Sequence, residues 1–169
     1  MGETFKFERL DCTTIDKNIF NQLVDVENNA AGVPYSREDL KEIVEWKNND
    51  TFVCYIDDEI VGFLTMNRDS KKFGGCIYLV NVAVTEDHQR RGIAKRLMFE
   101  AFNHYSQTNE PTRTIGLHVS EANDKAKNLY KNVGFTLKEF EKDDDGSVSM
   151  AMTTTLEVWG QGIHKVLGI

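Results

Sequence analysis

The sequence predicts a single-domain mixed α/β (α+β) fold, with a mostly antiparallel central sheet of about seven strands flanked by about four helices. Two observations predict it. Apolar residues alternate in some segments and recur at helical spacing in others, in the order strand, two helices, three strands, helix, strand, helix, two strands. The strand, helix and strand between Cys76 and Val119 also require a parallel crossover, which makes the sheet mixed.

The first segments predict one strand followed by two helices. Alternating phenylalanines near Phe5 indicate the strand, and apolar residues between 15 and 26 recur near helical spacing. A second helix is expected over 36–47, because Ser36 can cap it and Asp39 completes an S-x-x-D capping box.

The middle of the chain predicts three strands and a helix. Residues 51–56 and 60–66 are apolar runs joined by the acidic turn 57–59, a pattern typical of a hairpin. The run 76–84, CIYLVNVAV, is too apolar to alternate, so we expect both of its faces to be covered. From Gly92 to about Tyr105 the apolar positions form one helical stripe.

The last segments predict a strand, a helix and a terminal pair of strands. The strand is RTIGLHV (113–119), and apolar positions over 122–133 mark a helix that Gly134 ends. The segments 134–141 and 147–153 flank the turn KDDDG and therefore predict an antiparallel pair.

Charge limits the partners of the protein. The formal net charge is −7 and the pI is near 5.1. Nucleic-acid binding needs a surplus of Lys and Arg to neutralise phosphates, so we expect no nucleic-acid partner. Cationic partners such as amines are electrostatically easier.

The cysteines and the hydropathy indicate a reduced compartment. The three cysteines form no CxxC pair, and one is left over in any disulfide scheme, so a cytoplasmic location is expected. The first ten residues hold no apolar leader, Lys6 stands where a myristoylation signal carries Ser or Thr, and no apolar run is long enough to cross a membrane. No histidine has a partner at metal-ligand spacing, so no metal is expected.

The stretch HQRRGIAK (88–95) joins the apolar strand to the next helix. A helix N-terminus offers unpaired N–H groups and positive potential, and a small residue such as Gly92 lets an anion approach them. Arg90, Arg91 and Lys95 would add positive charge around a pyrophosphate. The alternative is a solvated basic first turn, although basic residues there oppose the helix dipole. Neither the P-loop motif nor the dinucleotide-binding motif is present.

Two motifs together resemble the GNAT superfamily of acetyl-CoA-dependent N-acetyltransferases. QRRGIA (89–94) is similar to its Q/R-x-x-G-x-G/A signature, and NDKAKNLYKNVGF (123–135) is similar to its N-x-x-A-x-x-x-Y-x-x-x-G-F segment. The resemblance runs from about Phe5 to Thr155 and is closest, through PYSREDL and NVAVTEDHQRRGIA, to the ribosomal-protein alanine type of protein N-terminal acetyltransferases.

The resemblance implies a donor site for acetyl-CoA. It places the pantetheine arm beside 82–84, at a bulge whose free N–H groups polarise the acetyl carbonyl, and it makes Tyr130 the proton donor to the CoA sulfur. The alternative for Tyr130 is a core tyrosine. The residues implied to contact acetyl-CoA are Val82, Ala83, Val84, Gln89, Arg90, Arg91, Gly92, Ile93, Ala94, Lys95, Asn123 and Tyr130.

On the acceptor side the chain departs from the alanine type. His118 stands in LHV where those enzymes carry a Glu base, and a similar LHV occurs in a eukaryotic N-terminal acetyltransferase family whose His works with a Tyr of the preceding strand. Tyr78 occupies that strand position. An imidazole can accept an amine proton near neutral pH, so His118 and Tyr78 are the candidate base pair, with a packed strand histidine as the alternative. Glu27 or Tyr35 could face a cationic amine, or could form a surface turn.

The predicted function is acetyl transfer from acetyl-CoA to a primary amine, by direct attack in a ternary complex. The acceptor is a protein N-terminus or a small-molecule amine. The alternatives are a catalytically silent acyl-CoA sensor and a transferase for a longer acyl-CoA. Residues 1–155 are expected to form the domain, and the apolar extension 156–169 to pack on it or on a second subunit of a homodimer.

Overall fold

We describe the fold from a computed structural model of the 169-residue chain. It describes residues 2–69, 71, 73–108, 110 and 112–169. The strands are β1 (Phe5–Asp11), β2 (Asn49–Ile56), β3 (Glu59–Asn67), β4 (Ile77–Val84), β5 (Thr114–Ser120), β6 (Thr136–Lys142) and β7 (Val148–Thr155). The helices are α1 (Lys17–Asn28), α2 (Arg37–Glu45), the short 3-10 helix η1 (Glu86–His88), α3 (Ile93–Ser106), α4 (Asp124–Asn132) and α5 (Leu156–Leu167).

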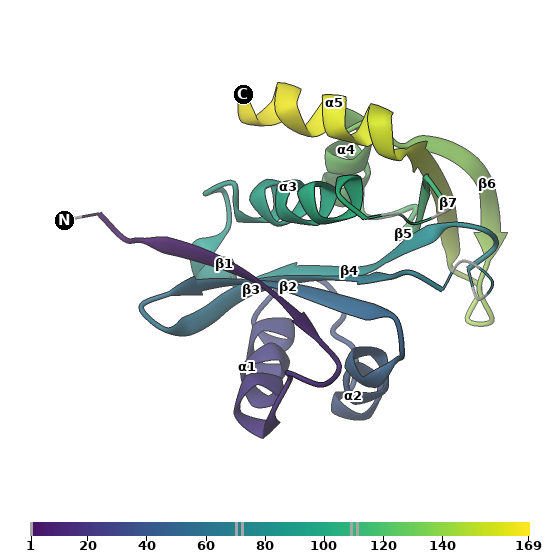
Figure 1. Cartoon of the computed structure of the whole chain (residues 1–169). Coiled ribbons are helices and arrows are strands. Elements are labelled where there is room, and N and C mark those ends of the chain that lie inside the picture. Colours follow the sequence, from purple (N-terminus) through teal and green to yellow (C-terminus); the bar gives the residue numbers. More distant parts are fainter. Residues whose placement is uncertain (1, 70, 72, 109, 111) are drawn as a thin grey trace.

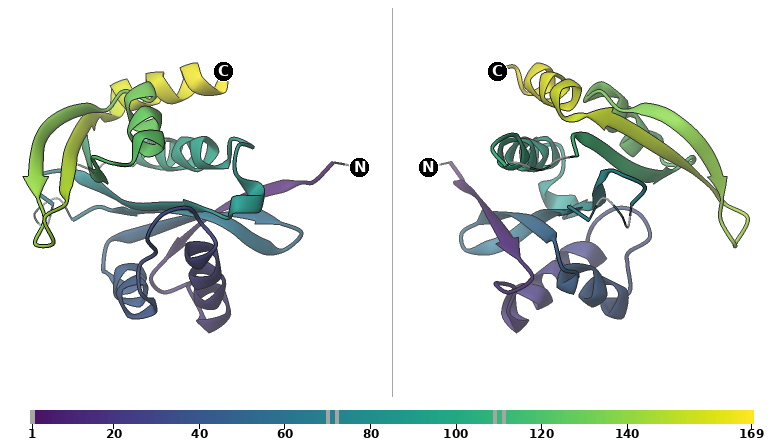
Figure 2. Two further views of the ribbon diagram at one scale, coloured as in Figure 1. Left: turned by 180° about the vertical axis from the view of Figure 1, so that it is seen from behind. Right: turned by 45° about the vertical axis from the view of Figure 1, so that its right-hand side comes forward.

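One sheet of seven strands, in the order β1-β2-β3-β4-β5-β7-β6, forms the middle layer. α1 and α2 cover one face, and α3, α4 and α5 lie over the other (Figures 1 and 2). All neighbouring strands are antiparallel except β4 and β5, which are parallel and are connected through α3. The mixed, mostly antiparallel sheet and the parallel crossover predicted from sequence are therefore confirmed.

Local signals in the sequence place several element ends correctly. The Ser36 side chain accepts a hydrogen bond from the Asp39 N–H at 3.1 Å, so the predicted capping box starts α2. Asp57 and Asp58 both have positive φ, at 50° and 67°. That conformation gives a two-residue turn whose twist matches antiparallel strands, and it joins β2 to β3.

Two hydrophobic clusters fill the space between the sheet and its two helical layers. The larger lies under α3, α4 and α5 and includes the fully buried Leu97, Met98 and Trp159. The smaller lies under α1 and α2 and includes Leu23 and Phe63. β4 was expected to be covered on both faces, but its middle residues 80–82 are only half-buried, because they border the open part of the sheet described below.

The extension beyond residue 155 contains a fifth helix, which its sequence pattern does not predict. α5 lies against α3 and β7, and Leu156, Trp159 and Ile163 belong to the larger core cluster. Gly160 and Gly162 disfavour a helix by propensity, yet both are required by close approach. A Cβ on Gly160 would lie 2.4 Å from the Phe102 ring, and one on Gly162 would lie 2.4 Å from the Val133 backbone. Contact of this segment with a second subunit stays a prediction.

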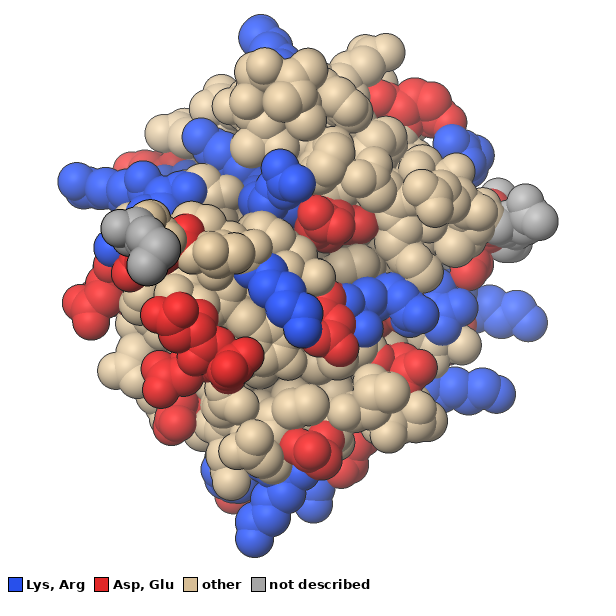
Figure 3. Space-filling view, turned by 60° about the vertical axis from the view of Figure 1, so that its left-hand side comes forward, with Lys and Arg blue, Asp and Glu red and all other residues tan. Residues whose placement is uncertain are grey.

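Charges of both signs share the surface. On the face shown in Figure 3, Lys and Arg side chains lie among Asp and Glu side chains, and no broad area of positive charge is visible. Within the described residues, no helix is both long and apolar enough to cross a membrane.

The tight contact at Gly162 gives a test of how α5 is held. Gly162→Ala should lower the free energy of unfolding by about 1–3 kcal/mol, because the added methyl must displace the Val133 backbone. Helix propensity alone predicts the opposite sign, since Ala is favoured over Gly by roughly 1 kcal/mol. Urea denaturation measures the difference. Gln161→Ala, on the exposed side of the same helix, is the matched control, and equal stability of the two variants would contradict the packing described.

Candidate active site

The sheet opens between β4 and β5. β4 pairs with β3 along nearly its whole length, but with β5 only at Ile77↔Ile115 and Tyr78↔Gly116. Gly116 allows this short contact, because a Cβ there would lie 3.1 Å from the Cys76 Cβ. Beyond Tyr78, the β5-facing edge of β4 has no strand partner in the described chain, so its N–H and C=O groups are free to bind a ligand.

A bulge in β4 lies inside this open region. Thr65 pairs with Asn81 and Met66 pairs with Leu79, so Val80 is an extra residue in β4. The family resemblance implied a bulge beside residues 82–84, and the irregularity instead precedes them. A bulge bends its strand and leaves one residue unpaired, which helps β4 to diverge from β5. Of the expected donor-binding residues, Val82 is half-buried whereas Ala83 and Val84 are buried.

The loop before α3 is held by Gln89. Its Nε2 donates to the Val84 carbonyl at 3.0 Å, and its Oε1 accepts from Lys125 Nζ of α4 at 3.0 Å. Arg90 and Gly92 both have positive φ, at 63° and 76°. A non-glycine residue in that region is uncommon and marks a loop held in one shape by its surroundings.

The N-terminus of α3 is open to a ligand. Its N-cap is Gly92, which has no side chain to cap the helix, and the Arg96 N–H donates to the Gly92 carbonyl at 2.9 Å. The amides of the first turn therefore point out of the helix together with its positive dipole end. Gly62 of β3 lets this turn lie close to the sheet, because a Cβ there would be 3.1 Å from Ile93 Cγ2.

The basic side chains near the start of α3 differ in whether another side chain binds them. Arg91 pairs with Glu3, whereas Arg90 and Lys95 have no ion-pair or hydrogen-bond partner among the described residues. Asn123 caps α4, since its Oδ1 accepts from the Ala126 N–H at 3.1 Å, and only its Nδ2 remains for a ligand. Asn123 therefore lies outside the helix, at its start, and Tyr130 lies near its end.

The candidate base pair is brought together on the other side of the opening. Tyr78 is the last residue of β4 paired with β5, and His118 lies two residues beyond its partner Gly116. Tyr78 Oη and His118 Nδ1 are 2.6 Å apart. The Phe73 ring stacks on Tyr78, with centroids 4.4 Å apart and planes 6° apart. The alternative of a histidine packed beneath a helix does not fit, because His118 is exposed.

Burial sets the protonation of the tyrosines. Tyr130 is only 8% exposed, and burial, with a smaller contribution from Tyr35, raises its pKa to about 12. Burial also raises the pKa of Tyr78, reinforced by Tyr35 and then by the Glu141 carboxylate. Both phenols are therefore protonated at neutral pH, and Tyr35 lies close enough to each to influence its ionisation.

Glu27 is buried and holds two groups of the protein, and its contact with an acceptor amine stays a prediction. It is only 7% exposed, and each carboxylate oxygen accepts one hydrogen bond from the protein. Oε1 accepts from the Tyr35 N–H at 3.1 Å, and Oε2 accepts from Asn81 Nδ2 at 2.8 Å. The carboxylate thus ties the loop that carries Tyr35 to the bulged part of β4, and Tyr35, 40% exposed, is the member of the pair that can reach a ligand.

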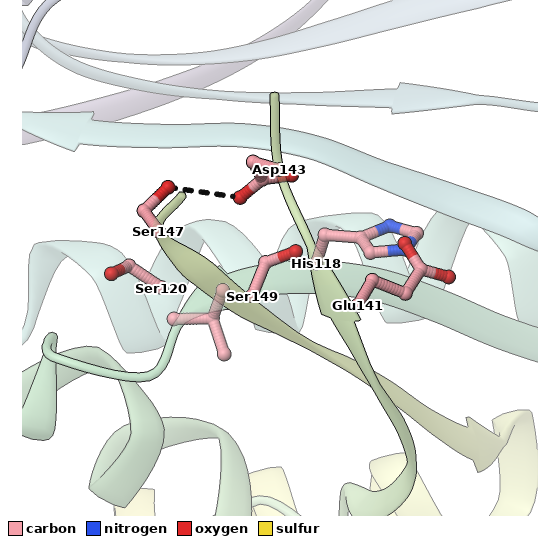
Figure 4. Close-up of a pocket in the computed structure, with 7 residues that line it drawn as sticks. His118, Ser120, Glu141, Asp143, Ser147 and Ser149 are labelled. Carbon is pink, nitrogen blue, oxygen red and sulfur yellow. Dashed lines mark hydrogen bonds and ion pairs between the residues drawn. The ribbon is translucent and has the colours of Figure 1, made fainter. Parts of the chain in front are cut away.

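A cleft beside His118 is lined by polar side chains that were not among the site residues predicted from the sequence. The cleft, of about 410 Å³, runs along the outer strands and is drawn in Figure 4. Its lining residues are His118, Val119, Ser120, Glu141, Asp143, Ser147 and Ser149. The alternation of serines in SVS before the apolar MAM was the available signal, because alternate residues of a strand share a face. Glu141, whose Oε2 lies 2.9 Å from His118 Nε2, had no such signal.

Comparison with known proteins identifies the family. The sequence model of the acetyltransferase (GNAT) family matches residues 20–135, which includes β4, the α3 loop and α4. The chain belongs to the GNAT acetyltransferase family. This assignment places the protein among the acyltransferases and confirms the resemblance read from the two motifs.

Individual GNAT relatives agree in fold. A segment of 61 residues is 46% identical to the chloroplastic GCN5-related N-acetyltransferase 4 of Arabidopsis thaliana, covering 36% of this chain and 20% of that protein. The ribosomal-protein-S18-alanine N-acetyltransferase of Escherichia coli superposes with a TM-score of 0.74 at 18% identity, over 90% of this chain and 94% of that one. The structure of Arabidopsis thaliana NAA60 in complex with acetyl-CoA superposes with a TM-score of 0.71 at 20% identity. The superposition covers 91% of this chain and 99% of the NAA60 chain. At these identities, the two superpositions show that this chain and the two proteins share a fold.

The buried Glu27 can be tested without any assumption about the reaction. Glu27→Ala leaves the Tyr35 N–H and the Asn81 amide without their acceptor, so the free energy of unfolding should fall by about 1–3 kcal/mol. Hydrogen exchange at the Tyr35 amide should become faster. Asp25→Ala, an exposed carboxylate on the same helix, is the matched control and should change neither. Equal behaviour of the two variants would contradict the tie between the loop and the bulge.

Proposed function

We propose that this GNAT protein is an acetyl-CoA-dependent N-acetyltransferase that acetylates a primary amine by direct attack in a ternary complex. The observation that carries the proposal is the Tyr78–His118 pair, 2.6 Å apart, at the point where β4 and β5 separate. A base, the free edge of β4 and the uncapped N-terminus of α3 would then border one opening. Acyl transfer from CoA to an amine needs a base, a polarised acetyl carbonyl and a held donor, and these three parts would supply them.

The donor side of the opening fits a diphosphate carried on a long amide arm. The first-turn amides of α3 would hold the diphosphate, with charge from Arg90 and Lys95, and Gly92 would let it approach. The free edge of β4 over 82–84 would bind the amide arm and polarise the acetyl carbonyl. Asn123, whose Nδ2 stays free, would donate to the same substrate.

The acceptor side supplies proton transfer. An amine attacks only as the neutral base, so the Tyr78–His118 pair would take the proton that the ammonium group loses. Tyr130 would donate its phenol proton to the departing thiolate, since its raised pKa of about 12 keeps it protonated at neutral pH. The C–N bond forms as the C–S bond breaks. The acceptor nitrogen loses two protons through the pair to solvent, one before attack and one as the amide forms. Tyr130 gives one proton to the thiolate and regains one from solvent, so one proton is released per turnover.

The acceptor is a protein N-terminus or a small-molecule amine. The net charge of −7 and the carboxylates Glu141 and Asp143 beside His118 support a cationic acceptor. The names of the superposed relatives, which include an alanine N-acetyltransferase for ribosomal protein S18, support a peptide N-terminus. Tyr35 would line the acceptor side from the loop that Glu27 holds.

We also propose that residues 1–155 form the transferase domain and that the extension 156–169, which contains α5, packs on it against α3. Two other functions use the same fold: a catalytically silent acyl-CoA sensor, and a transferase for a longer acyl-CoA. Retention of Tyr78, His118 and Tyr130 argues against the sensor. Thermal-shift measurements with acetyl-, propionyl- and succinyl-CoA address the acyl length, because the tighter ligand raises the apparent stability more.

Turnover tests the enzyme directly. The protein with acetyl-CoA and a panel of N-terminal peptides and small amines should release free thiol and give an acetylated product by mass spectrometry. Tyr130→Phe should lower kcat by about 10²-fold, with CoA affinity by calorimetry largely unchanged. Tyr55→Phe, a half-buried tyrosine under α1, is the control and should keep full activity. Tight binding of acetyl-CoA without turnover on any amine would favour the sensor.

A further inference from the structure

His118 is held from both sides by groups of two other strands. Its Nδ1 lies 2.6 Å from Tyr78 Oη of β4, and its Nε2 lies 2.9 Å from Glu141 Oε2 of β6. Figure 4 shows the Glu141 carboxylate beside the imidazole ring. Both ring nitrogens are thus engaged, and neither is open to an acceptor amine.

The two contacts fix the tautomer of the neutral ring. A carboxylate can only accept, so the 2.9 Å contact is a hydrogen bond only when Nε2 carries the proton. The other tautomer would set the lone pair of Nε2 against a carboxylate oxygen. With the proton on Nε2, Nδ1 is an acceptor, and the phenol of Tyr78, which burial keeps protonated, is its donor.

We propose that Glu141 is a positioning residue that completes a Tyr78–His118–Glu141 relay, in which Tyr78 Oη is the atom that takes the amine proton. This inference rests on the proposed function. As one N–H bond of the amine breaks, its proton moves to Tyr78 Oη while the phenol proton moves to Nδ1. Tyr78 ends unchanged, and the imidazolium is paired with the Glu141 carboxylate until it releases a proton to solvent. The arrangement resembles a nucleophile–His–carboxylate triad in which the outer oxygen removes a proton and does not attack.

The surroundings make the relay testable by substitution. The side chains of His118 and Glu141 are 40% and 44% exposed, and an ion pair so exposed contributes little to stability. Glu141→Gln should therefore fold normally. The ionisable groups around the pair are Tyr78 from β4, Asp143 beyond the end of β6, Tyr35 from the loop and Tyr130 from α4. Of the two carboxylates nearby in the described chain, Glu141 contacts the imidazole ring, and Asp143 makes no hydrogen bond or ion pair with it.

Glu139 provides a matched control. It lies on the same strand, two residues from Glu141 and so on the same face, and it pairs in register with Ala151, as His118 does from the other side. It has no hydrogen-bond or ion-pair partner among the described residues. Glu139→Gln removes the same charge from the same region without touching the imidazole.

The experiment compares wild type, Glu141→Gln, Glu141→Asp, Glu139→Gln and His118→Ala in kcat/KM against pH. Glu141→Gln should lower kcat about tenfold, less than loss of a fully buried triad carboxylate, because water reaches this site. Glu141→Asp should be faster than Glu141→Gln, because it restores the carboxylate. The KM for acetyl-CoA should stay unchanged in each Glu141 variant, and Glu139→Gln should match wild type.

A pH profile of Glu141→Gln equal to that of Glu139→Gln, with His118→Ala impaired, would overturn the relay.

A second measurement separates failure of the relay from failure of the proposed function. Nitrogen-15 NMR of labelled histidine reports the tautomer without turnover. The relay predicts that neutral His118 carries its proton on Nε2 in the wild type and that this preference weakens in Glu141→Gln. A proton on Nδ1 would overturn the relay even in an active enzyme, whereas absence of acetyl transfer in the wild type would overturn the proposed function.

Discussion

The short pairing of β4 with β5 is the constraint on which the rest of the site depends. The two strands form only the rows Ile77↔Ile115 and Tyr78↔Gly116, and the bulge at Val80 then turns β4 away. A continuous ladder would satisfy the β4 edge internally and leave no room for a ligand. The divergence instead leaves backbone groups free on one side and sets Tyr78 and His118, on adjacent strands, at the point of separation.

The opening is bordered by α3 on one face of the sheet and by the loop between α1 and α2 on the other. α3 begins beside the free edge of β4, because Gln89 bonds the end of that strand and Gly62 permits close contact. On the other face, the carboxylate of Glu27 ties the loop bearing Tyr35 to the bulge. Both sides of the proposed reaction are therefore attached to β4. A substitution at the Val80 bulge should change the structure of the donor side and of the acceptor side together.

Much of the fold could be predicted from the sequence, since its signals are local. The cap at Ser36, the turn at Asp57 and the period of the apolar residues each act over a few positions. α5 could not be predicted, because Gly160 and Gly162 are bad helix formers that tertiary contact requires. For the site, the motifs indicated the Gln89 loop, Tyr130 and His118, but the partners Glu141, Asn81 and Glu3 come from distant segments whose pairing no local pattern encodes.

The most direct test of the account is the map of backbone amides that respond to CoA, measured by nitrogen-15 NMR. The amides of 80–84 and of 91–95 should change together, because the free edge of β4 and the uncapped start of α3 would bind one molecule. Changes confined to a different cleft, of about 580 Å³ between the end of α1 and η1, would contradict this placement of CoA. So would binding that leaves the amides of 80–84 unaffected.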